Sequence, residues 1–263
     1  MTKTLILIPS RMAATRLPGK PLLKINNLSI VSHVFKRAEE AGIGEVIVAT
    51  QDQEIYADVL KNGGKAVLTS KDHKTGTDRI FEAYKKLNIK NVDYILNLQG
   101  DEPNIDKDDI VNLNNLMINS QSEIGTLAAS IKDKTMLDNK NVVKVVTKSK
   151  LEKNNFPIAI NFSRYSQSKN KENIYHHVGI YSYKTRTLEK LVSLPQTKNE
   201  IKNSLEQLRA LENKIKINVA LIKSTPIGVD TEEDYLAIKK IMEYKTTKWV
   251  KFIFKELLEL THT

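Results

Sequence analysis

Short apolar runs alternate with amphipathic segments along the first half of the chain. The apolar run at 5–8 is followed by a pattern of helical period over 30–41 and then by the apolar sequence EVIVAT. Strands that alternate with helices at this rhythm predict βαβ units and a mainly parallel sheet with helices on both faces. The same rhythm predicts further strands at KAVLT, DYILNLQ and IGTLAAS, and further helices over 54–61, 78–87 and 107–118.

The rhythm changes after about residue 135, where strand-like sequences follow one another with fewer helices between them. These sequences are NVVKVVTK, FPIAINFSR and HHVGIYSYK, and they predict a smaller, partly antiparallel section. Helices are then expected over 185–194 and 198–213, and KIKINVALI and TPIGVD are expected to form late strands. Thr231 is expected to cap a closing helix that has acidic residues in its first turn.

The C-terminal sequence TTKWVKFIFKELLELTHT places large apolar residues at helical spacing, with lysines between them. This pattern favours a helix that packs on the body of the protein or on a second subunit. A helix that lies at a membrane interface is the alternative.

The composition indicates a globular protein with an ordinary core. The chain has 263 residues, 40% of them hydrophobic and 27% charged, which argues against a disordered or fibrous protein. There is no cysteine, so disulfides, thiolate metal sites and cysteine nucleophiles are excluded, and a reducing compartment is favoured. The apolar stretch before Pro9 is too short for a signal peptide or a membrane span. We therefore expect a soluble, cytoplasmic protein.

The chain is basic, with 41 Lys and Arg against 31 Asp and Glu and a formal charge of +10. Such a charge suits a nucleic acid, an anionic membrane surface or an anionic small substrate. The lysines are scattered through Lys/Asn-rich stretches such as KKLNIKN, and basic residues do not interleave with aromatic ones as in single-strand binders. We expect neither a nucleic-acid partner nor stable insertion into a membrane.

Ligands of parallel α/β sheets collect beyond the carboxyl ends of the strands, so the loops there are the first candidates for a site. The loop SRMAATRLPGKPL follows the first strand and carries Arg11, Arg16 and Lys20. It has neither a GxGxxG pattern nor a Walker lysine motif, which disfavours a dinucleotide or P-loop fold. Its cations and small residues suit phosphate oxygens, although a solvated basic loop fits the pattern equally well.

Two aspartates lie at the expected ends of strands. Asp101, in NLQGDEP, stands beside Gly100 after a strongly apolar strand, and such an aspartate can present a carboxylate oxygen to Mg²⁺. A tight acidic turn is the alternative. Asp230, in GVDTEED, would by itself be an ordinary helix cap, but a second strand-end aspartate is what a shared metal site requires.

Three other stretches carry candidate chemistry. HKTGTDR leads through Gly76 and Thr77 into a helix, whose first amides suit an anion, although an ordinary capped helix fits as well. EQLRALE predicts a helix whose charges are normally solvated or paired. His176 and His177 are adjacent in a strand and point to opposite faces, so a two-histidine metal site is not expected.

Taken together, these stretches resemble the family of 3-deoxy-manno-octulosonate (Kdo) cytidylyltransferases, also called CMP-Kdo synthetases. IPSRMAATRLPGKPL, HKTGTDR, NLQGDEP, NVVKVV, FSR, HHVGIYSY, LEQLRALE and GVDTEEDY occur in the order and approximate spacing of that family, from about residue 5 to 235. The resemblance implies a Rossmann-like nucleotidyltransferase fold. It implies a single cytidylyltransferase domain over 1–245, of which about 135–185 form a smaller dimerisation and acceptor section, and a helical tail over 246–263.

The resemblance also implies a reaction in which CTP and Kdo give CMP-Kdo and pyrophosphate for lipopolysaccharide biosynthesis, catalysed by a cytoplasmic, Mg²⁺-dependent homodimer. The anomeric hydroxyl of the sugar would attack the α-phosphorus in line while pyrophosphate leaves. Positioning, cationic charge and the metal would carry this reaction, so no protein nucleophile is required.

The family's functional residues carry over to positions that match its motifs. Asp101 and Asp230 would bind the Mg²⁺ between the α-phosphate and the sugar, and they would be catalytic together with Lys20 and Arg16. The nucleotide-binding residues would be Arg11, Arg16, Lys20, Gly76, Thr77, Arg79 and Gln99. The sugar-binding residues would be Arg164, His177, Tyr181, Glu206 and Gln207, with Arg164 as a partner for the sugar's carboxylate.

The sequence departs from the family pattern at 165–173, where YSQSKNKEN is short and polar. This departure motivates a related acceptor, such as 8-amino-Kdo, as the alternative substrate. A non-catalytic basic protein that binds a nucleic acid or a membrane surface is a remoter alternative, based on the +10 charge and the tail. Against it, the two aspartates would repel phosphate without a metal.

Overall fold

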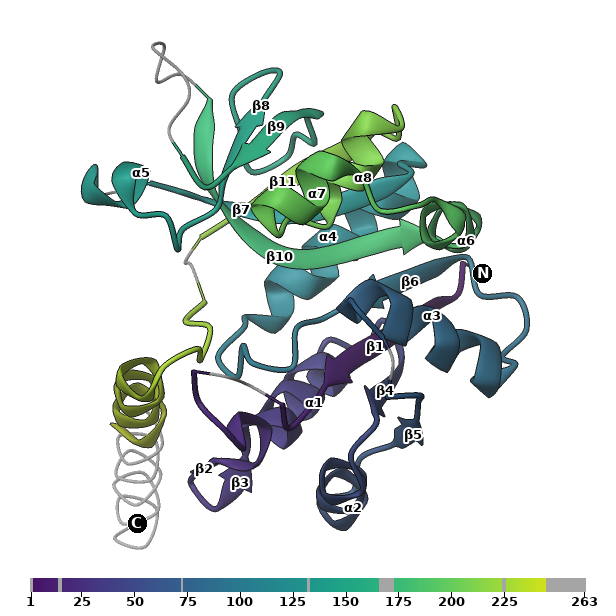
Figure 1. Cartoon of the computed structure of the whole chain (residues 1–263), viewed down its shortest axis with the longest axis vertical. Coiled ribbons are helices and arrows are strands. Elements are labelled where there is room, and N and C mark those ends of the chain that lie inside the picture. The colour runs from purple at the N-terminus through teal and green to yellow at the C-terminus, as the bar shows by residue number, and fades with distance from the viewer. Residues whose placement is uncertain are drawn as a thin grey trace, which may run out of the picture.

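The computed structural model describes residues 2–13, 16–71, 73–131, 133–165, 173–223 and 226–244. A mixed sheet forms its centre, in the strand order β11-β7-β10-β6-β1-β4-β5 (Figure 1). The strands of this path are β1 (Thr4–Ser10), β4 (Gly44–Thr50), β5 (Ala66–Leu68), β6 (Tyr94–Asn97), β7 (Ile124–Ser130), β10 (Ile174–Lys184) and β11 (Ile217–Ile222). β1 pairs in parallel with both β4 and β6, so its carboxyl end lies at the centre of one sheet edge.

Alternating side chains of β1 enter two different hydrophobic clusters. Leu5 and Leu7 belong to one cluster, and Ile6 and Ile8 belong to the other. A parallel strand that is buried on both faces reads as a continuous apolar run, which is why the sequence shows no polar alternation here. The mainly parallel sheet with helices on both faces, predicted from the sequence, is confirmed.

Helices cover the two faces of the sheet in two groups. Helices α1 (Ile30–Glu40), α2 (Gln53–Lys61) and α4 (Lys107–Ser120) contribute to the cluster that contains Ile6. Helices α3 (Gly76–Leu87), α6 (Thr185–Ser193) and α8 (Gln207–Glu212) contribute to the cluster that contains Leu5. The shorter elements are η1 (Lys20–Leu22), β2 (Lys24–Ile25), β3 (Leu28–Ser29), α5 (Thr135–Asp138) and α7 (Lys198–Asn203).

The predicted antiparallel section is built around β10, which runs antiparallel to both β6 and β7. The N-terminal end of β10 also pairs with β8 (Lys144–Thr147), and β8 pairs with β9 (Ala159–Ser163). The long strand β10 therefore belongs both to the central sheet and to the smaller section (Figure 1).

Two expectations from the sequence are wrong. The single helix expected over 198–213 is divided into α7 and α8, because Ser204 takes a left-handed conformation with φ of 52° and ends α7. The late strand expected at TPIGVD does not form in its described part, 226–230. This segment is held instead by the Val229 amide, which donates to the Asp101 carbonyl at 2.9 Å.

The expected closing helix is confirmed over 232–244. The Thr231 hydroxyl accepts from the Asp234 amide at 3.2 Å, and the Asp234 carboxylate accepts from the Thr231 amide at 2.9 Å. This reciprocal pair satisfies the amides of Thr231 and Asp234 at the start of the helix. Ile238 packs into a small cluster with Ile25 and Ile30, which attaches the helix to the N-terminal half. The tail expected over 246–263 lies outside the described residues.

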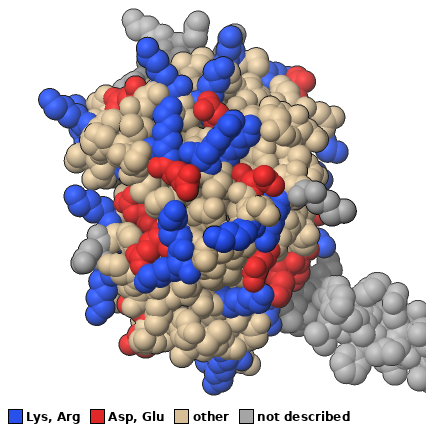
Figure 2. All heavy atoms as spheres, turned by 90° about the vertical axis from the view of Figure 1, so that its right-hand side faces the viewer, with Lys and Arg blue, Asp and Glu red and all other residues tan. Residues whose placement is uncertain are grey.

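Charges of both signs are mixed over the described surface that Figure 2 shows, where Lys and Arg side chains lie between Asp and Glu side chains. This distribution agrees with the view that the charge of +10 reflects a general bias toward lysine. None of the helices in the described ranges is long and apolar enough to cross a membrane.

Candidate active site

The loop after β1 lies against the loop after β6 at the carboxyl edge of the sheet. A side chain at Gly100 would bring its Cβ to 2.9 Å from the Pro9 carbonyl oxygen, so this approach requires glycine. The first loop is also attached to the start of α2, because the Met12 amide donates to the Asp52 carboxylate at 2.7 Å. Gly19 has φ of 71°, a left-handed conformation, immediately before Lys20. One glycine thus allows the two loops to approach each other, and another allows the turn that precedes Lys20.

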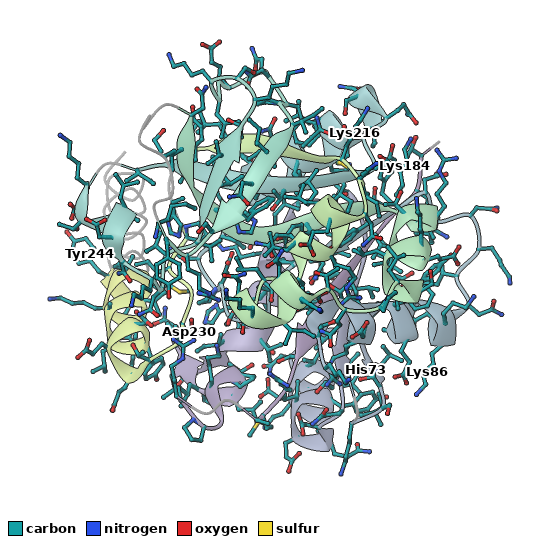
Figure 3. All side chains as sticks on the ribbon, turned by 45° about the horizontal axis from the view of Figure 1, so that its top comes forward. His73, Lys86, Lys184, Lys216, Asp230 and Tyr244 are labelled. Atoms are coloured by element: carbon teal, nitrogen blue, oxygen red, sulfur yellow. The ribbon has the colours of Figure 1, made fainter. Side chains whose placement is uncertain are left out.

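A polar cavity of about 380 Å³ opens between these loops and the start of α3. In Figure 3 Asp230, beside the yellow C-terminal helix, and His73 lie well apart, and both line this cavity. Its lining includes every residue predicted to bind the nucleotide except Thr77: Arg11, Arg16, Lys20, Gly76, Arg79 and Gln99.

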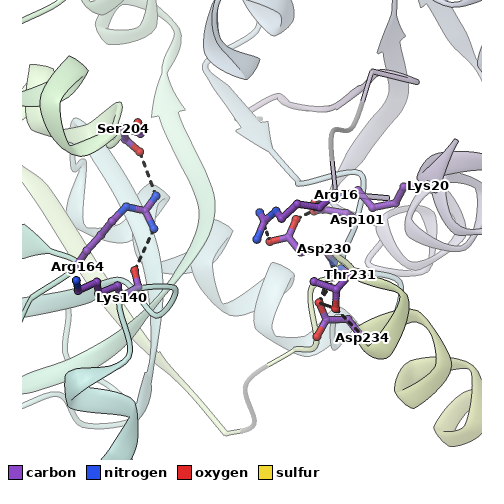
Figure 4. Close-up of polar contacts among 9 residues, drawn as sticks. All are labelled: Arg16, Lys20, Asp101, Lys140, Arg164, Ser204, Asp230, Thr231 and Asp234. Carbon is purple, nitrogen blue, oxygen red and sulfur yellow. Dashed lines mark hydrogen bonds and ion pairs between the residues drawn. The ribbon is translucent and has the colours of Figure 1, made fainter. Parts of the chain in front are cut away.

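Lys20 joins the two predicted metal ligands. Its ammonium lies 2.6 Å from Asp101 Oδ2 and 3.2 Å from Asp230 Oδ1, and Arg16 Nη2 lies 3.0 Å from Asp230 Oδ2 (Figure 4). Burial by itself would lower the pKa of Lys20, but the two carboxylates outweigh it and raise that pKa. The two aspartates thus share one cation between them.

A second cavity, of about 620 Å³, adjoins the first. Gln99, Asp101, Glu206 and Asp230 line both cavities, so the aspartate pair lies where the two meet. The lining of the second cavity also contains Thr77 and the other residues predicted to bind the sugar: Arg164, His177, Tyr181 and Gln207.

Arg164 lies on the other side of this second cavity from the aspartate pair in Figure 4. Its guanidinium donates to the backbone carbonyls of Asn203 at 3.0 Å, Lys140 at 3.3 Å and Ser204 at 3.4 Å. These partners are neutral, so they orient the guanidinium without neutralising its charge. Such a group suits an anionic ligand.

The aromatic wall of the second cavity is held neutral by burial. Burial, and to a lesser extent His176, lowers the pKa of His177 to about 3, and its Nε2 lies 3.0 Å from Thr126 Oγ1. Burial also raises the pKa of Tyr181, whose hydroxyl has no hydrogen-bond partner among the described residues. A ligand hydroxyl would supply that missing partner.

The first turn of α3 separates the two cavities. Thr77 Oγ1 donates to Glu206 Oε2 at 2.5 Å, so the anion at this helix start is a carboxylate of the protein itself. Arg79 is buried and donates to Thr69 Oγ1 at 2.6 Å and to Gln51 Oε1 at 2.7 Å. The Thr75 hydroxyl accepts from the Asp78 amide at 3.1 Å, so the ordinary capped helix start expected as one alternative for HKTGTDR is present. The ligand roles of these residues stay predictions.

Two polar residues of the second cavity were missed by the sequence analysis. Asn97 Oδ1 and Glu102 Oε2 are buried without a hydrogen-bond partner in the described ranges, and both residues line this cavity. Burial, followed by Asp101 and Asp230, raises the pKa of Glu102 to about 8. The available signal was an asparagine at the end of an apolar strand and a glutamate next to Asp101.

Comparisons with known proteins show the family to which this chain is related. A family model described as Cytidylyltransferase matches residues 5–217. The 3-deoxy-manno-octulosonate cytidylyltransferase of Afipia carboxidovorans is 45% identical over 91% of this chain and 96% of its own, and that of Nitrobacter hamburgensis is 43% identical over 92% and 93%. A solved CMP:2-keto-3-deoxy-manno-octonic acid synthetase in complex with CTP is 35% identical. It has a TM-score of 0.84 and covers 93% of this chain and 100% of its own.

Proposed function

The chain belongs to the cytidylyltransferase family, within the group of 3-deoxy-manno-octulosonate cytidylyltransferases, and we propose that it transfers CMP from CTP to Kdo. The products would be CMP-Kdo, for lipopolysaccharide biosynthesis, and pyrophosphate. One observation carries the proposal: Asp101 and Asp230 lie where a cation-lined cavity meets a second cavity that suits a sugar acid.

The first cavity would hold the triphosphate of CTP. Arg11, Arg16 and Lys20 offer guanidinium and ammonium groups to the β- and γ-phosphates, whose negative charge grows as pyrophosphate leaves. Gly76 brings the start of α3 to the same cavity. Cations that line this cavity would stabilise the leaving group by their charge.

Asp101 and Asp230 would hold Mg²⁺, and their arrangement fits that ion. Their carboxylates converge on one ammonium, so their positions already suit a shared cation. Mg²⁺ takes one or two protein carboxylates and completes its shell with phosphates and water. When bound, it supplies positive charge at the α-phosphate and lowers the pKa of a coordinated hydroxyl.

The second cavity would orient Kdo for attack by its anomeric hydroxyl on the α-phosphorus. Arg164 would bind the carboxylate of the sugar, and Tyr181 and Gln207 would meet its hydroxyls. His177 would contact the sugar as a neutral ring, since its pKa is about 3. The two substrates would be held in line for the reaction, so they would not have to meet by diffusion. This positioning would contribute most of the rate enhancement.

Pyrophosphate release from CTP in the presence of Mg²⁺ tests this proposal. We expect release that requires Kdo, and a fall of at least about 100-fold in Asp101→Asn and in Asp230→Asn, because each loses a carboxylate at the junction. Asp93→Asn is the control, since Asp93 binds the Lys3 amide at 2.8 Å. Release without Kdo, or full activity in both site variants, would contradict the assignment.

The same assay with 8-amino-Kdo separates the two acceptors. The segment that motivates the alternative falls mostly at 166–172, outside the described residues. Greater turnover with 8-amino-Kdo than with Kdo would identify the aminated sugar as the substrate.

A homodimer and a cytoplasmic location belong to the same proposal. The strand β9 pairs only with β8 among the named strands of the described chain, and Ile160, on this edge, is 60% exposed. Tyr165, just beyond β9, is 53% exposed. Apolar side chains at the edge of a sheet support a contact between copies through the 135–185 section. The absence of cysteine supports a reducing compartment.

A further inference from the structure

Adjacent residues in the first turn of α3 face different cavities. Gly76 lines the cavity assigned to the nucleotide, and Thr77 lines the one assigned to the sugar. The turn is well defined, because the Thr75 hydroxyl accepts from the Asp78 amide at 3.1 Å and caps the helix. The contacts of Thr77 in one cavity are therefore fixed in position relative to those of Gly76 in the other.

Thr77 holds the carboxylate of Glu206, a residue 129 positions later in the chain. Its hydroxyl donates to Glu206 Oε2 at 2.5 Å, and its backbone amide also donates to this carboxylate. The amide belongs to the start of a helix, where the backbone dipoles favour negative charge. The hydroxyl of Thr77 thus fixes the direction of the Glu206 carboxyl group, and the positive end of the helix dipole attracts its charge.

Burial, and after it the nearby Asp78, raises the pKa of Glu206, and the donors of Thr77 and the charge of Arg209 offset this rise only in part. Tyr181 and Tyr183 line a small pocket together with Thr77 and Glu206. A buried carboxylate without donors takes up a proton or turns away. Held by Thr77, it can accept a hydrogen bond from a ligand hydroxyl in a fixed direction.

We propose that Thr77 is a positioning residue for the sugar acid: it fixes Glu206 at the junction of the two cavities and so aligns the acceptor with the bound nucleotide. This inference rests on the proposed function. It differs from the role that the family resemblance implies, in which Thr77 seats the nucleotide. Glu206 lines both cavities, so its direction sets where a sugar hydroxyl lies relative to Asp101 and Asp230.

Thr77→Val and Thr77→Ser test the role by separating the two substrates. Leaving a buried polar group without its hydrogen-bond partner costs enough to change binding by about tenfold or more. We therefore expect Thr77→Val to raise KM for Kdo by about tenfold, while KM for CTP changes less than about threefold. Thr77→Ser restores the hydroxyl and should bring KM for Kdo back to within about threefold of the wild-type value.

Two further variants distinguish positioning from simple stabilisation of the fold. Adding Thr77→Val to Glu206→Gln should raise KM for Kdo less than it does in the wild type, because the two residues act as a unit. Thr4→Val is the matched control. Thr4 is also a buried threonine, and its hydroxyl donates to Asn114 Oδ1 at 2.7 Å at the other end of β1. The control should lower stability and leave both KM values unchanged.

Calorimetric binding of CTP separates a failure of this inference from a failure of the proposed function. Wild-type protein that does not turn over Kdo would refute the function. In either case an unchanged Kd for CTP in Thr77→Val supports the separation of Thr77 from the nucleotide. A Kd for CTP weakened about tenfold, an equal rise in both KM values, or failure of Thr77→Ser to restore Kdo use would overturn the inference.

Discussion

Lys20 occupies the place between two carboxylates that the proposed metal would share. Its ammonium contacts both Asp101 and Asp230, and its side chain is only 13% exposed. In the absence of CTP this contact would compete with the proposed divalent cation for the same oxygens. When a triphosphate binds, its oxygens give the ammonium another partner.

We therefore expect Lys20→Met to bind Mn²⁺ about tenfold more tightly than the wild type in the absence of nucleotide, because the competing charge is gone. The same variant should use CTP poorly, because it lacks a phosphate contact. Electron paramagnetic resonance of free Mn²⁺ measures the first effect without any turnover.

Arg11→Met is the matched control for Lys20→Met. It removes a cation from the same cavity, and no ion pair joins Arg11 to either aspartate among the described contacts. Its Mn²⁺ affinity should change much less. Weaker Mn²⁺ binding in Lys20→Met than in the wild type would show that the ammonium does not compete with the ion.

Single residues show where sequence reasoning succeeds and where it stops. Arg16 and Lys20 belong to the loop that follows an apolar strand, so their place at the carboxyl edge of the sheet could be predicted. The partner of Thr77 could not, because Glu206 lies 129 residues away and only tertiary packing brings the two together. Asn97 was missed because one polar residue at the end of an otherwise apolar strand does not stand out as a functional residue.

At the scale of secondary-structure elements, the division between α7 and α8 was not predicted from the sequence. The stretch 198–213 contains neither glycine nor proline, so its helical spacing reads as unbroken. The structure nevertheless turns at Ser204, and α8 begins directly after Glu206. The turn places Glu206 against α3, so a local cost in backbone conformation serves a long-range contact.

A buried ion pair holds these two short helices together. Arg209 Nε and Nη2 donate to Glu200 at 2.8 Å and 2.5 Å, and the residues are only 3% and 2% exposed. We expect Arg209→Met to lower the free energy of unfolding by about 3–5 kcal/mol, because it leaves a buried carboxylate uncompensated. Urea unfolding measures the loss.

Two comparisons check this interpretation of the pair. The double variant Glu200→Leu with Arg209→Met should recover part of the lost stability, since no unpaired charge remains. Arg37→Met breaks an exposed pair with Glu40 at 2.9 Å and should cost less than about 1 kcal/mol. Equal losses in Arg209→Met and Arg37→Met would mean that burial does not determine the effect.

At the scale of the whole molecule, periodicity was enough to predict a mainly parallel sheet covered by helices. It did not predict the strand order, in which the antiparallel β10 separates β6 from β7. Pairing between distant strands depends on side-chain packing across the sheet, which a single sequence does not encode locally. Candidate site residues were easier to identify from the sequence than the strand order, because many of them lie in loops that follow strands.

The C-terminal segment gives the last prediction, because the described residues that line the two cavities all precede it. Their linings end at Asp234, and the closing helix is attached to the body through Ile238. Removal of residues 246–263 should therefore leave kcat/KM for CTP and Kdo within about twofold of the full-length value. Steady-state kinetics of the shortened chain measure this, and its mass in solution and sedimentation with anionic vesicles test the subunit and membrane interpretations of the tail. A loss of activity of about tenfold or more, with stability unchanged, would instead assign the tail a role in the reaction itself.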